Sequence, residues 1–111
     1  MEKLHVLWTS GDKEVALKMV FMYVYNAKKH GWWEQINLIV WGPSAMLAAQ
    51  DSQIQHEIIE MAHAGIRIEA CKACADSYGV SDKLEKLGIN VRFMGLPLTQ
   101  YLQSDEKLIT F

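Results

Sequence analysis

The sequence has few cysteines, no excess of basic residues and no obvious export signal. Its 111 residues include 13 acidic and 11 basic side chains, for a net charge of −2. Because nucleic-acid affinity depends mainly on Lys and Arg neutralising phosphates, we expect no nucleic-acid partner. Two cysteines together with a short apolar run near the N-terminus, too short for a signal peptide, indicate a reducing compartment. We therefore expect a cytoplasmic protein.

Long hydrophobic runs are also missing. The longest apolar stretch, from Val15 to Tyr25, is about half the length of a bilayer span and is interrupted by Lys18. We therefore expect no membrane association. No repeat, low-complexity stretch or linker is visible, and half of the residues are hydrophobic. This balance is typical of a folded protein, and it predicts a single domain over residues 1–111.

What is present is an alternation of short apolar runs with longer helical segments. Strands are expected at 4–8, 36–41, 66–70, 89–94 and 107–111. Helices are expected at 13–29, from Ser44 to Gly65 with a break near Asp51, at 72–78 and at 81–87, with a helical turn at 98–102. This order predicts a three-layer α/β/α fold with a five-stranded, mainly parallel sheet, a flavodoxin/Rossmann-like variant with right-handed crossovers. The order of the strands in the sheet does not follow from the sequence.

The first helix has almost no polar face between Val15 and Tyr25. A helix that is apolar all round must be covered on its outer side as well as its inner side. In so small a domain the simplest cover is another subunit, so we expect a homo-oligomer. The alternative is a helix that is partly covered by loops of its own chain.

The ends of the strands are where a site is expected. In parallel α/β sheets, ligands gather beyond the carboxyl ends of the strands. The first two such segments carry small and hydroxyl residues that suit close approach to a ligand. These candidate ligand-binding residues are Thr9, Ser10, Gly11, Gly42, Pro43 and Ser44. The spaced glycines and following Lys of a phosphate-binding loop are missing, but helix N-termini can still hold a small anion.

Cys71 and Cys74 follow the third expected strand and open a short helix. The partial positive charge of a helix N-terminus favours a thiolate, so we expect the pKa of Cys71 to be lowered. Four interpretations of the pair are open. The first is a redox disulfide between the two cysteines, and the second is a metal site completed by His56 and His63. The third is that both cysteines pack as small buried side chains, and the fourth is that Cys71 is a nucleophile that carries sulfur.

Two further residues near the expected sheet need an interpretation. Tyr78 is close to the cysteine helix, and its hydroxyl is a candidate ligand contact. His5 lies inside the first expected strand, where a hydrogen-bonded core histidine is more common than a catalytic base. We expect no cofactor and no resident metal ion.

The chain resembles the DsrE/DsrF-like family, which includes YchN-like and TusD-type sulfur-relay proteins. The resemblance runs from Leu4 through Trp41-Gly42-Pro43-Ser44 to Phe111, and its most specific part is Ala70-Cys71 followed by Gly79-Val80. In the sulfur-relay members a cysteine stands at this strand end, which implies a persulfide-carrying role for Cys71. The resemblance also implies trimers or hexamers and dedicated sulfur donor and acceptor proteins. Cys74 has no counterpart, and it either resolves a persulfide as a disulfide or packs.

Two functions of different classes follow. The first is a cytosolic sulfur carrier or sulfurtransferase that uses Cys71, with the loops after the first two strands lining the pocket. The second is a non-catalytic oligomeric module that binds a small anionic ligand in its crevice. Loading with a persulfide donor separates the two functions, because only the first one requires a sulfur adduct on Cys71.

Overall fold

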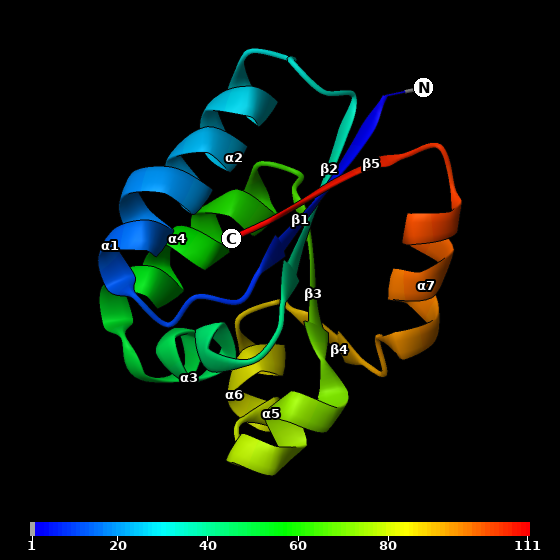
Figure 1. The fold of residues 1–111 in the computed structure, drawn as a ribbon. Coiled ribbons are helices and arrows are strands. Elements are labelled where there is room, and N and C mark those ends of the chain that lie inside the picture. The colour runs from blue at the N-terminus through cyan, green and yellow to red at the C-terminus, as the bar shows by residue number, and fades with distance from the viewer. Residues whose placement is uncertain (1) are drawn as a thin grey trace.

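A computed structural model describes residues 2–111, which form one parallel sheet with helices on both faces (Figure 1). The strands are β1 (Lys3–Trp8), β2 (Gln35–Val40), β3 (Arg67–Cys71), β4 (Asn90–Arg92) and β5 (Lys107–Thr110). Their order across the sheet is β4-β3-β2-β1-β5, and every neighbouring pair is parallel. The expected α/β class and the parallel sheet are confirmed.

The helices divide unequally between the two faces of the sheet. They are α1 (Lys13–Val15), η1 (Ala16–Val20), α2 (Phe21–Lys29), α3 (Pro43–Gln50), α4 (Ser52–His63), α5 (Lys72–Tyr78), α6 (Ser81–Lys86) and α7 (Gly95–Gln103). Figure 1 shows α7 on the opposite side of the sheet from α2 and α4. Right-handed crossovers explain this division. The chain steps in one direction from β1 to β4, and its return across the sheet to β5 places α7 on the other face.

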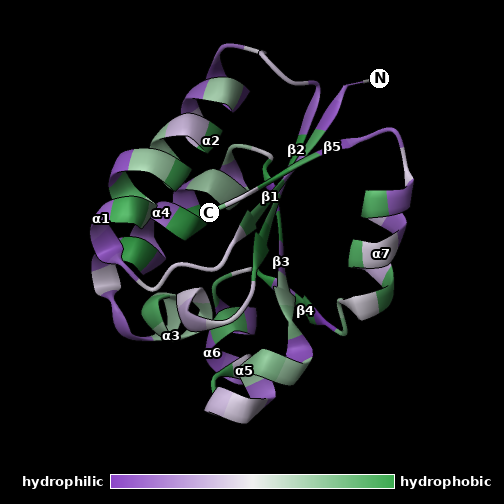
Figure 2. Cartoon of the chain, in the orientation of Figure 1, coloured by the Kyte–Doolittle hydropathy of each residue, from purple (hydrophilic) through white to green (hydrophobic). Residues whose placement is uncertain are grey.

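The main core lies between the sheet and the helices α1 to α6. Alternate strand residues point into it, and β1 contributes Leu4, Val6 and Trp8. The Trp8 ring meets Phe21 of α2 edge-on, with 5.0 Å between ring centroids. Figure 2 shows that β1 and β2 are hydrophilic where they begin and become hydrophobic further along. The opposite face of the sheet carries more polar side chains and lies beneath α7.

Most of the expected boundaries are confirmed within one or two residues. The helix expected at 13–29 is present, with the π-helical segment η1 in its middle. The expected break near Asp51 is also present. Asp51 caps α4, and its carboxylate accepts a 2.9 Å hydrogen bond from the Ile54 backbone N–H.

Two expectations about the helix ends were wrong. The helix expected to start at Ser44 begins at Pro43, and its N-cap is Gly42, where the chain turns with φ 76° and ψ −140°, a conformation that glycine alone adopts easily. The turn expected at 98–102 is the longer helix α7, which begins at Gly95 and tolerates Pro97 in its first turn. As a consequence β4 is shorter than expected and ends at Arg92.

Candidate functional site

Cys71 lies where two neighbouring strands lead to opposite faces of the sheet. It is the last residue of β3, which continues into α5 in the main helical layer, whereas the adjacent β4 continues into α7 on the other face. Ligand crevices of open α/β sheets form outside the carboxyl ends of the strands at such a switch point. Cys71 pairs in register with Arg92, so the site is built from the ends of β3 and β4.

The side chain of Cys71 points toward α7 rather than into the main core. Ile68 and Ala70 face the main core, and the alternation along β3 sends Glu69 and Cys71 to the opposite face. Cys71 is 4% exposed and packs in a small cluster with Ile39 and Met94. We call Ile39, Cys71 and Met94 the sulfur cluster. Four half-buried side chains pack around it, namely Leu7, Trp41, Cys74 and Tyr101. Both cysteines are free thiols.

The expectation of a lowered thiol pKa was wrong. Burial raises the pKa of the Cys71 thiol, because a thiolate loses its hydration in this apolar cluster, and the neighbouring Cys74 side chain acts in the same direction. The backbone N–H groups of Ala73 and Cys74 at the start of α5 act in the opposite direction but are outweighed. Lys72 gives little help, since its ammonium group pairs with the Asp76 carboxylate at 3.0 Å.

The Gly79-Val80 pair of the family resemblance ends α5. Gly79 adopts the left-handed conformation with φ 71°, which lets the Val80 N–H donate a 2.8 Å hydrogen bond back to the Ala75 carbonyl. Val80 is then 8% exposed and packs in the main core. The pair therefore fixes the length and tilt of the helix that begins at Cys71.

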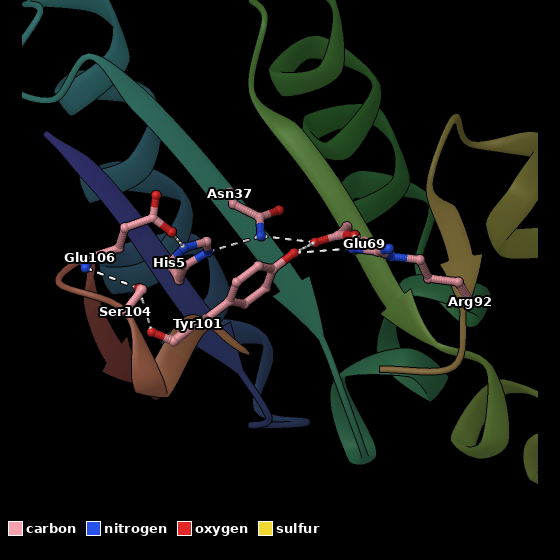
Figure 3. Close-up of polar contacts among 7 residues, drawn as sticks. All are labelled: His5, Asn37, Glu69, Arg92, Tyr101, Ser104 and Glu106. Atoms are coloured by element: carbon pink, nitrogen blue, oxygen red, sulfur yellow. Dashed lines mark hydrogen bonds and ion pairs between the residues drawn. The ribbon is translucent and has the colours of Figure 1, made fainter. Parts of the chain in front are cut away.

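Beside the cysteine, a chain of polar side chains crosses the face of the sheet under α7 (Figure 3). Its centre is Glu69, which is fully buried. Glu69 Oε1 accepts hydrogen bonds from Asn37 Nδ2 at 2.9 Å and from Tyr101 Oη at 2.7 Å. Glu69 Oε2 accepts from Arg92 Nε at 2.6 Å and from an Arg67 guanidinium nitrogen at 3.1 Å. One buried carboxylate thus joins β2, β3, β4 and α7.

His5 continues this chain on β1 and is a hydrogen-bonded core histidine, as expected. Its Nδ1 lies 3.0 Å from Asn37 Nδ2, and its Nε2 lies 2.9 Å from a Glu106 carboxylate oxygen. Because the Asn37 amide nitrogen donates to Glu69, the same nitrogen can only donate to His5. His5 Nδ1 is therefore the acceptor, and the neutral ring carries its proton on Nε2, which donates to Glu106. The Tyr101 ring stacks on His5 with 3.8 Å between centroids.

The ionisation of these groups follows from burial and hydrogen bonding together. Burial acts to raise the pKa of Glu69, but the hydrogen bonds from Tyr101 and Asn37 and the charges of Arg67 and Arg92 outweigh it, so that the pKa is lowered. Burial also raises the pKa of Tyr101, with a further contribution from the Glu69 carboxylate. Glu69 is therefore a carboxylate at neutral pH, and Tyr101 is its neutral donor.

Tyr101 connects this chain to the cover over Cys71. No residue of α7 is buried, and Leu96 and Leu102 are 69% and 63% exposed. Tyr101 reaches the sheet from this exposed helix. Met94, the N-cap residue of α7, is 1% exposed and belongs to the sulfur cluster. The same short helix therefore holds the polar chain at one end and closes the sulfur cluster at the other.

The loops after β1 and β2 lie together, as expected, but their donors are used within the chain. The Thr9 and Ser10 backbone N–H groups donate to the Phe111 carbonyl at 2.7 and 3.3 Å, and the Thr9 hydroxyl donates to the same oxygen at 2.9 Å. A Cβ on Gly11 would lie 3.1 Å from the Pro43 Cβ, so these two loops are in contact. The Thr9 and Ser10 donors are therefore already used by the Phe111 carbonyl and are not free for an anion.

The remaining candidates are placed as follows. Ser44 is fully buried, and its hydroxyl donates to the Trp8 carbonyl at 2.6 Å and accepts from the Trp41 N–H at 3.1 Å, which ties the ends of β1 and β2 together. Gly42 is partly exposed beside it. Tyr78 is 40% exposed at the far end of α5.

The interpretation of the cysteines as part of a metal site finds no structural support in the described part of the chain. His56 and His63 lie on α4, and within residues 2–111 no three His, Cys, Asp or Glu side chains come together in a group that could hold a metal ion. No helix between residues 2 and 111 has both the length and the apolar character needed to cross a bilayer.

The sequence interpretation missed Glu69, Tyr101, Met94 and Arg92. A signal for the first was available, because Arg67 and Glu69 alternate with Ile66, Ile68 and Ala70 along the third strand. This period of two places Glu69 on the same face as Cys71. Tyr101 and Met94 gave no such signal, since their contacts depend on α7 crossing to the far face of the sheet.

Comparisons with known proteins agree with this architecture. A family model described as the DsrE/DsrF-like family matches residues 3–111. No curated protein sequence matches the chain. Among solved structures, a conserved protein of unknown function from Bacteroides thetaiotaomicron, BT1422, is 47% identical with a TM-score of 0.97, over 99% of this chain and 95% of its own.

Two more distant structures share the fold. The YchN protein from E. coli is 18% identical with a TM-score of 0.71, over 100% of this chain and 99% of its own. A protein of unknown function from Methanobacterium thermoautotrophicum, MTH1491, is 16% identical with a TM-score of 0.76, over the full length of both chains. At these identities the likeness concerns the fold alone.

Proposed function

Because the chain belongs to the DsrE/DsrF-like family, we propose that it is a cytosolic carrier of sulfane sulfur that holds the sulfur as a persulfide on Cys71. The observation that carries this proposal is the position of Cys71, the last residue of β3 at the switch point of the sheet. A nucleophile belongs at this point of an α/β fold, and the family resemblance assigns a sulfur-carrying cysteine to the same strand end.

The chemistry is a transfer without net oxidation. The Cys71 thiolate attacks the terminal sulfur of a donor persulfide, the sulfur–sulfur bond of the donor breaks, and the donor leaves as a thiolate. Cys71 then carries one additional sulfur, and the same step in reverse passes that sulfur to an acceptor thiol. The proton of the resting Cys71 thiol goes to the leaving thiolate.

Burial suits storage of such a group. The walls formed by Ile39, Met94 and Tyr101 exclude water and small reductants from Cys71, which is 4% exposed. A persulfide in solution is lost to any thiol that reaches it, and an enclosed apolar cluster slows that loss. Burial also raises the pKa of Cys71, so less of the resting thiol is present as the reactive thiolate.

The alternative, a non-catalytic module for a small anionic ligand, finds less support. Its binding groups would be the loop donors after β1 and β2, and those of Thr9 and Ser10 already bond to the Phe111 carbonyl. Asp12, which caps α1 with hydrogen bonds from the Glu14 and Val15 N–H groups, places a carboxylate at that helix N-terminus. An anion approaching there would be repelled.

We further propose that the carrier is a homo-oligomer, a trimer or hexamer, that exchanges sulfur with donor and acceptor proteins. Met19 on η1 and Met22 and Tyr25 on α2 are 43%, 50% and 40% exposed. Next to them, an apolar groove of about 380 Å³ lies between η1, α2 and the edge strand β5. A contiguous apolar surface of this kind favours contact with another subunit.

The test is sulfur loading followed by intact mass spectrometry of the native protein. Wild type incubated with a persulfide donor, treated briefly with cyanide to remove exposed persulfide sulfur and then desalted should retain one sulfur atom per chain. Cys71→Ser should retain none, while the matched control Thr99→Ala, an exposed position on α7, should behave as wild type. Retention of sulfur by Cys71→Ser equal to that of wild type would overturn the proposal.

A further inference from the structure

A second thiol, that of Cys74, packs against the sulfur cluster and is more open to solvent. Cys74 is partly exposed, whereas Cys71 is 4% exposed. Both side chains contact the same small cluster with Ile39 and Met94. The exposed position belongs to the cysteine that has no counterpart in the family resemblance.

The backbone brings the two sulfurs to the same place. Cys71 is the N-cap of α5, with extended backbone at φ −68° and ψ 113°, and Cys74 is the third residue of the helix. A side chain at the N-cap folds over the backbone of the third helical residue, and positions three apart in a first turn are neighbours. The Cys74 thiol is close enough to contribute to the raised pKa of Cys71.

From these positions we propose that Cys74 is the entry thiol, which takes sulfur from the donor at the surface and passes it inward to Cys71. This inference rests on the proposed carrier function. This entry role explains how a sulfur atom can reach Cys71 while Met94 and Tyr101 stay packed over the Cys71 thiol. Cys74 is exposed to a donor on one side and faces Cys71 on the other.

The internal step balances without an oxidant or reductant. The Cys71 sulfur attacks the outer sulfur of the Cys74 persulfide, the sulfur–sulfur bond on Cys74 breaks, and Cys74 is regenerated as a thiol by the proton that Cys71 gives up. Attack on the inner sulfur instead would join Cys71 to Cys74 as a disulfide and release hydrogen sulfide. These two products differ in mass, one having gained a sulfur atom and the other having lost two hydrogens.

The experiment loads wild type, Cys74→Ser and Cys71→Ser with inorganic polysulfide for short times, and then locates the added sulfur by alkylation and peptide mapping. In wild type the sulfur should appear first on Cys74 and then on Cys71. Cys74→Ser should load Cys71 at least about tenfold more slowly than wild type loads Cys71. Cys71→Ser should load Cys74 at the wild-type rate but lose the sulfur rapidly to cyanide, which removes exposed persulfide sulfur.

The outcomes separate this inference from the carrier function. If Cys74→Ser loads Cys71 as fast as wild type, the entry role of Cys74 is refuted while the carrier function stands. If wild type yields the internal disulfide instead of a persulfide, Cys74 resolves rather than relays, and the inference is overturned. If wild type gains no sulfur at either position, the carrier function itself fails. Circular dichroism of both variants shows that each has kept the fold.

Discussion

The Tyr101 hydroxyl donates a 2.7 Å hydrogen bond to the buried carboxylate of Glu69. This contact joins α7, the helix that covers the sulfur cluster, to β3, the strand that ends at Cys71. The Glu69 and Cys71 side chains lie two residues apart on the same face of the strand. The polar chain under α7 and the sulfur cluster are therefore parts of one arrangement, in which Tyr101 holds the cover closed.

Replacing Tyr101 with Phe should loosen that cover. The ring still stacks on His5, but Glu69 loses one of its four hydrogen-bond donors, and a hydrogen bond to a charged group contributes about 1.5–3 kcal/mol to the unfolding free energy. Urea unfolding measures the loss, and alkylation of Cys71 should become faster in the same variant. The control is Tyr25→Phe on the exposed face of α2, which should change the unfolding free energy by less than about 0.5 kcal/mol. Equal stability of Tyr101→Phe and wild type would show that Tyr101 does not hold α7.

Acidification should reduce stability in a range set by His5. Burial lowers the pKa of His5, and the charge of Lys3 acts the same way, while Glu106 and Glu69 oppose it. The unfolded chain binds a proton near the ordinary pKa of about 6.5, and the native state does not, so stability falls as the pH drops below that value toward the lower folded pKa. Urea midpoints measured across this range should fall less steeply in His5→Gln than in wild type. Identical slopes would contradict the assignment.

At lower pH a second loss should follow from Glu69. Its folded pKa is lowered, so its contribution is present above the unfolded value of about 4.3 and is lost as the pH falls through the folded pKa. This loss should persist in His5→Gln, because that variant keeps the carboxylate and both arginines. The two ranges can thus be separated in one series of unfolding curves.

Gly79→Ala tests whether the end of α5 depends on backbone conformation. Nothing lies within 4 Å of an added Cβ, so the whole cost comes from the left-handed φ of 71°, and we expect a loss of about 1–2 kcal/mol. Gly95 is a matched control, since an added Cβ there also meets nothing within 4 Å and its φ is not positive. Thermal unfolding should therefore show a clear loss for Gly79→Ala and little change for Gly95→Ala. Similar losses in both would refute the conformational explanation.

The fold could be predicted from the sequence because its signals are local. Apolar runs such as residues 36–40 mark strands, and the caps at Asp12 and Asp51 mark where helices begin. Strand order could not be predicted, since it depends on which strands pair across long sequence separations. The position of β5 beside β1 is one such case, and it is what sends α7 to the far face.

The candidate site was predicted only in part, for the same reason. Its location at Cys71 followed from the rule about strand ends, but the surroundings of that sulfur come from segments that are distant in sequence. Met94 and Tyr101 close over Cys71 only after α7 crosses the sheet. The expectation of a lowered pKa considered the helix N-terminus alone, and the burial that outweighs it was not visible without the tertiary structure.

The oligomer proposal can be tested with one exposed residue. Met22 is 50% exposed on α2, and Met22→Glu places a charge where we propose a subunit contact. Wild type should sediment as a trimer or hexamer at micromolar concentration, and Met22→Glu should sediment as a smaller species. Gln53→Glu on the exposed side of α4 adds the same charge elsewhere and should not change the assembly. A monomeric wild type would contradict the proposal.

The most direct test of the central claim is a crystal structure of the protein after sulfur loading. The account predicts one additional sulfur atom bonded to Cys71 Sγ, enclosed by Ile39, Met94 and Tyr101, with Cys74 a free thiol. Unmodified Cys71 beside a persulfide confined to Cys74, or no added sulfur on either residue, would contradict it.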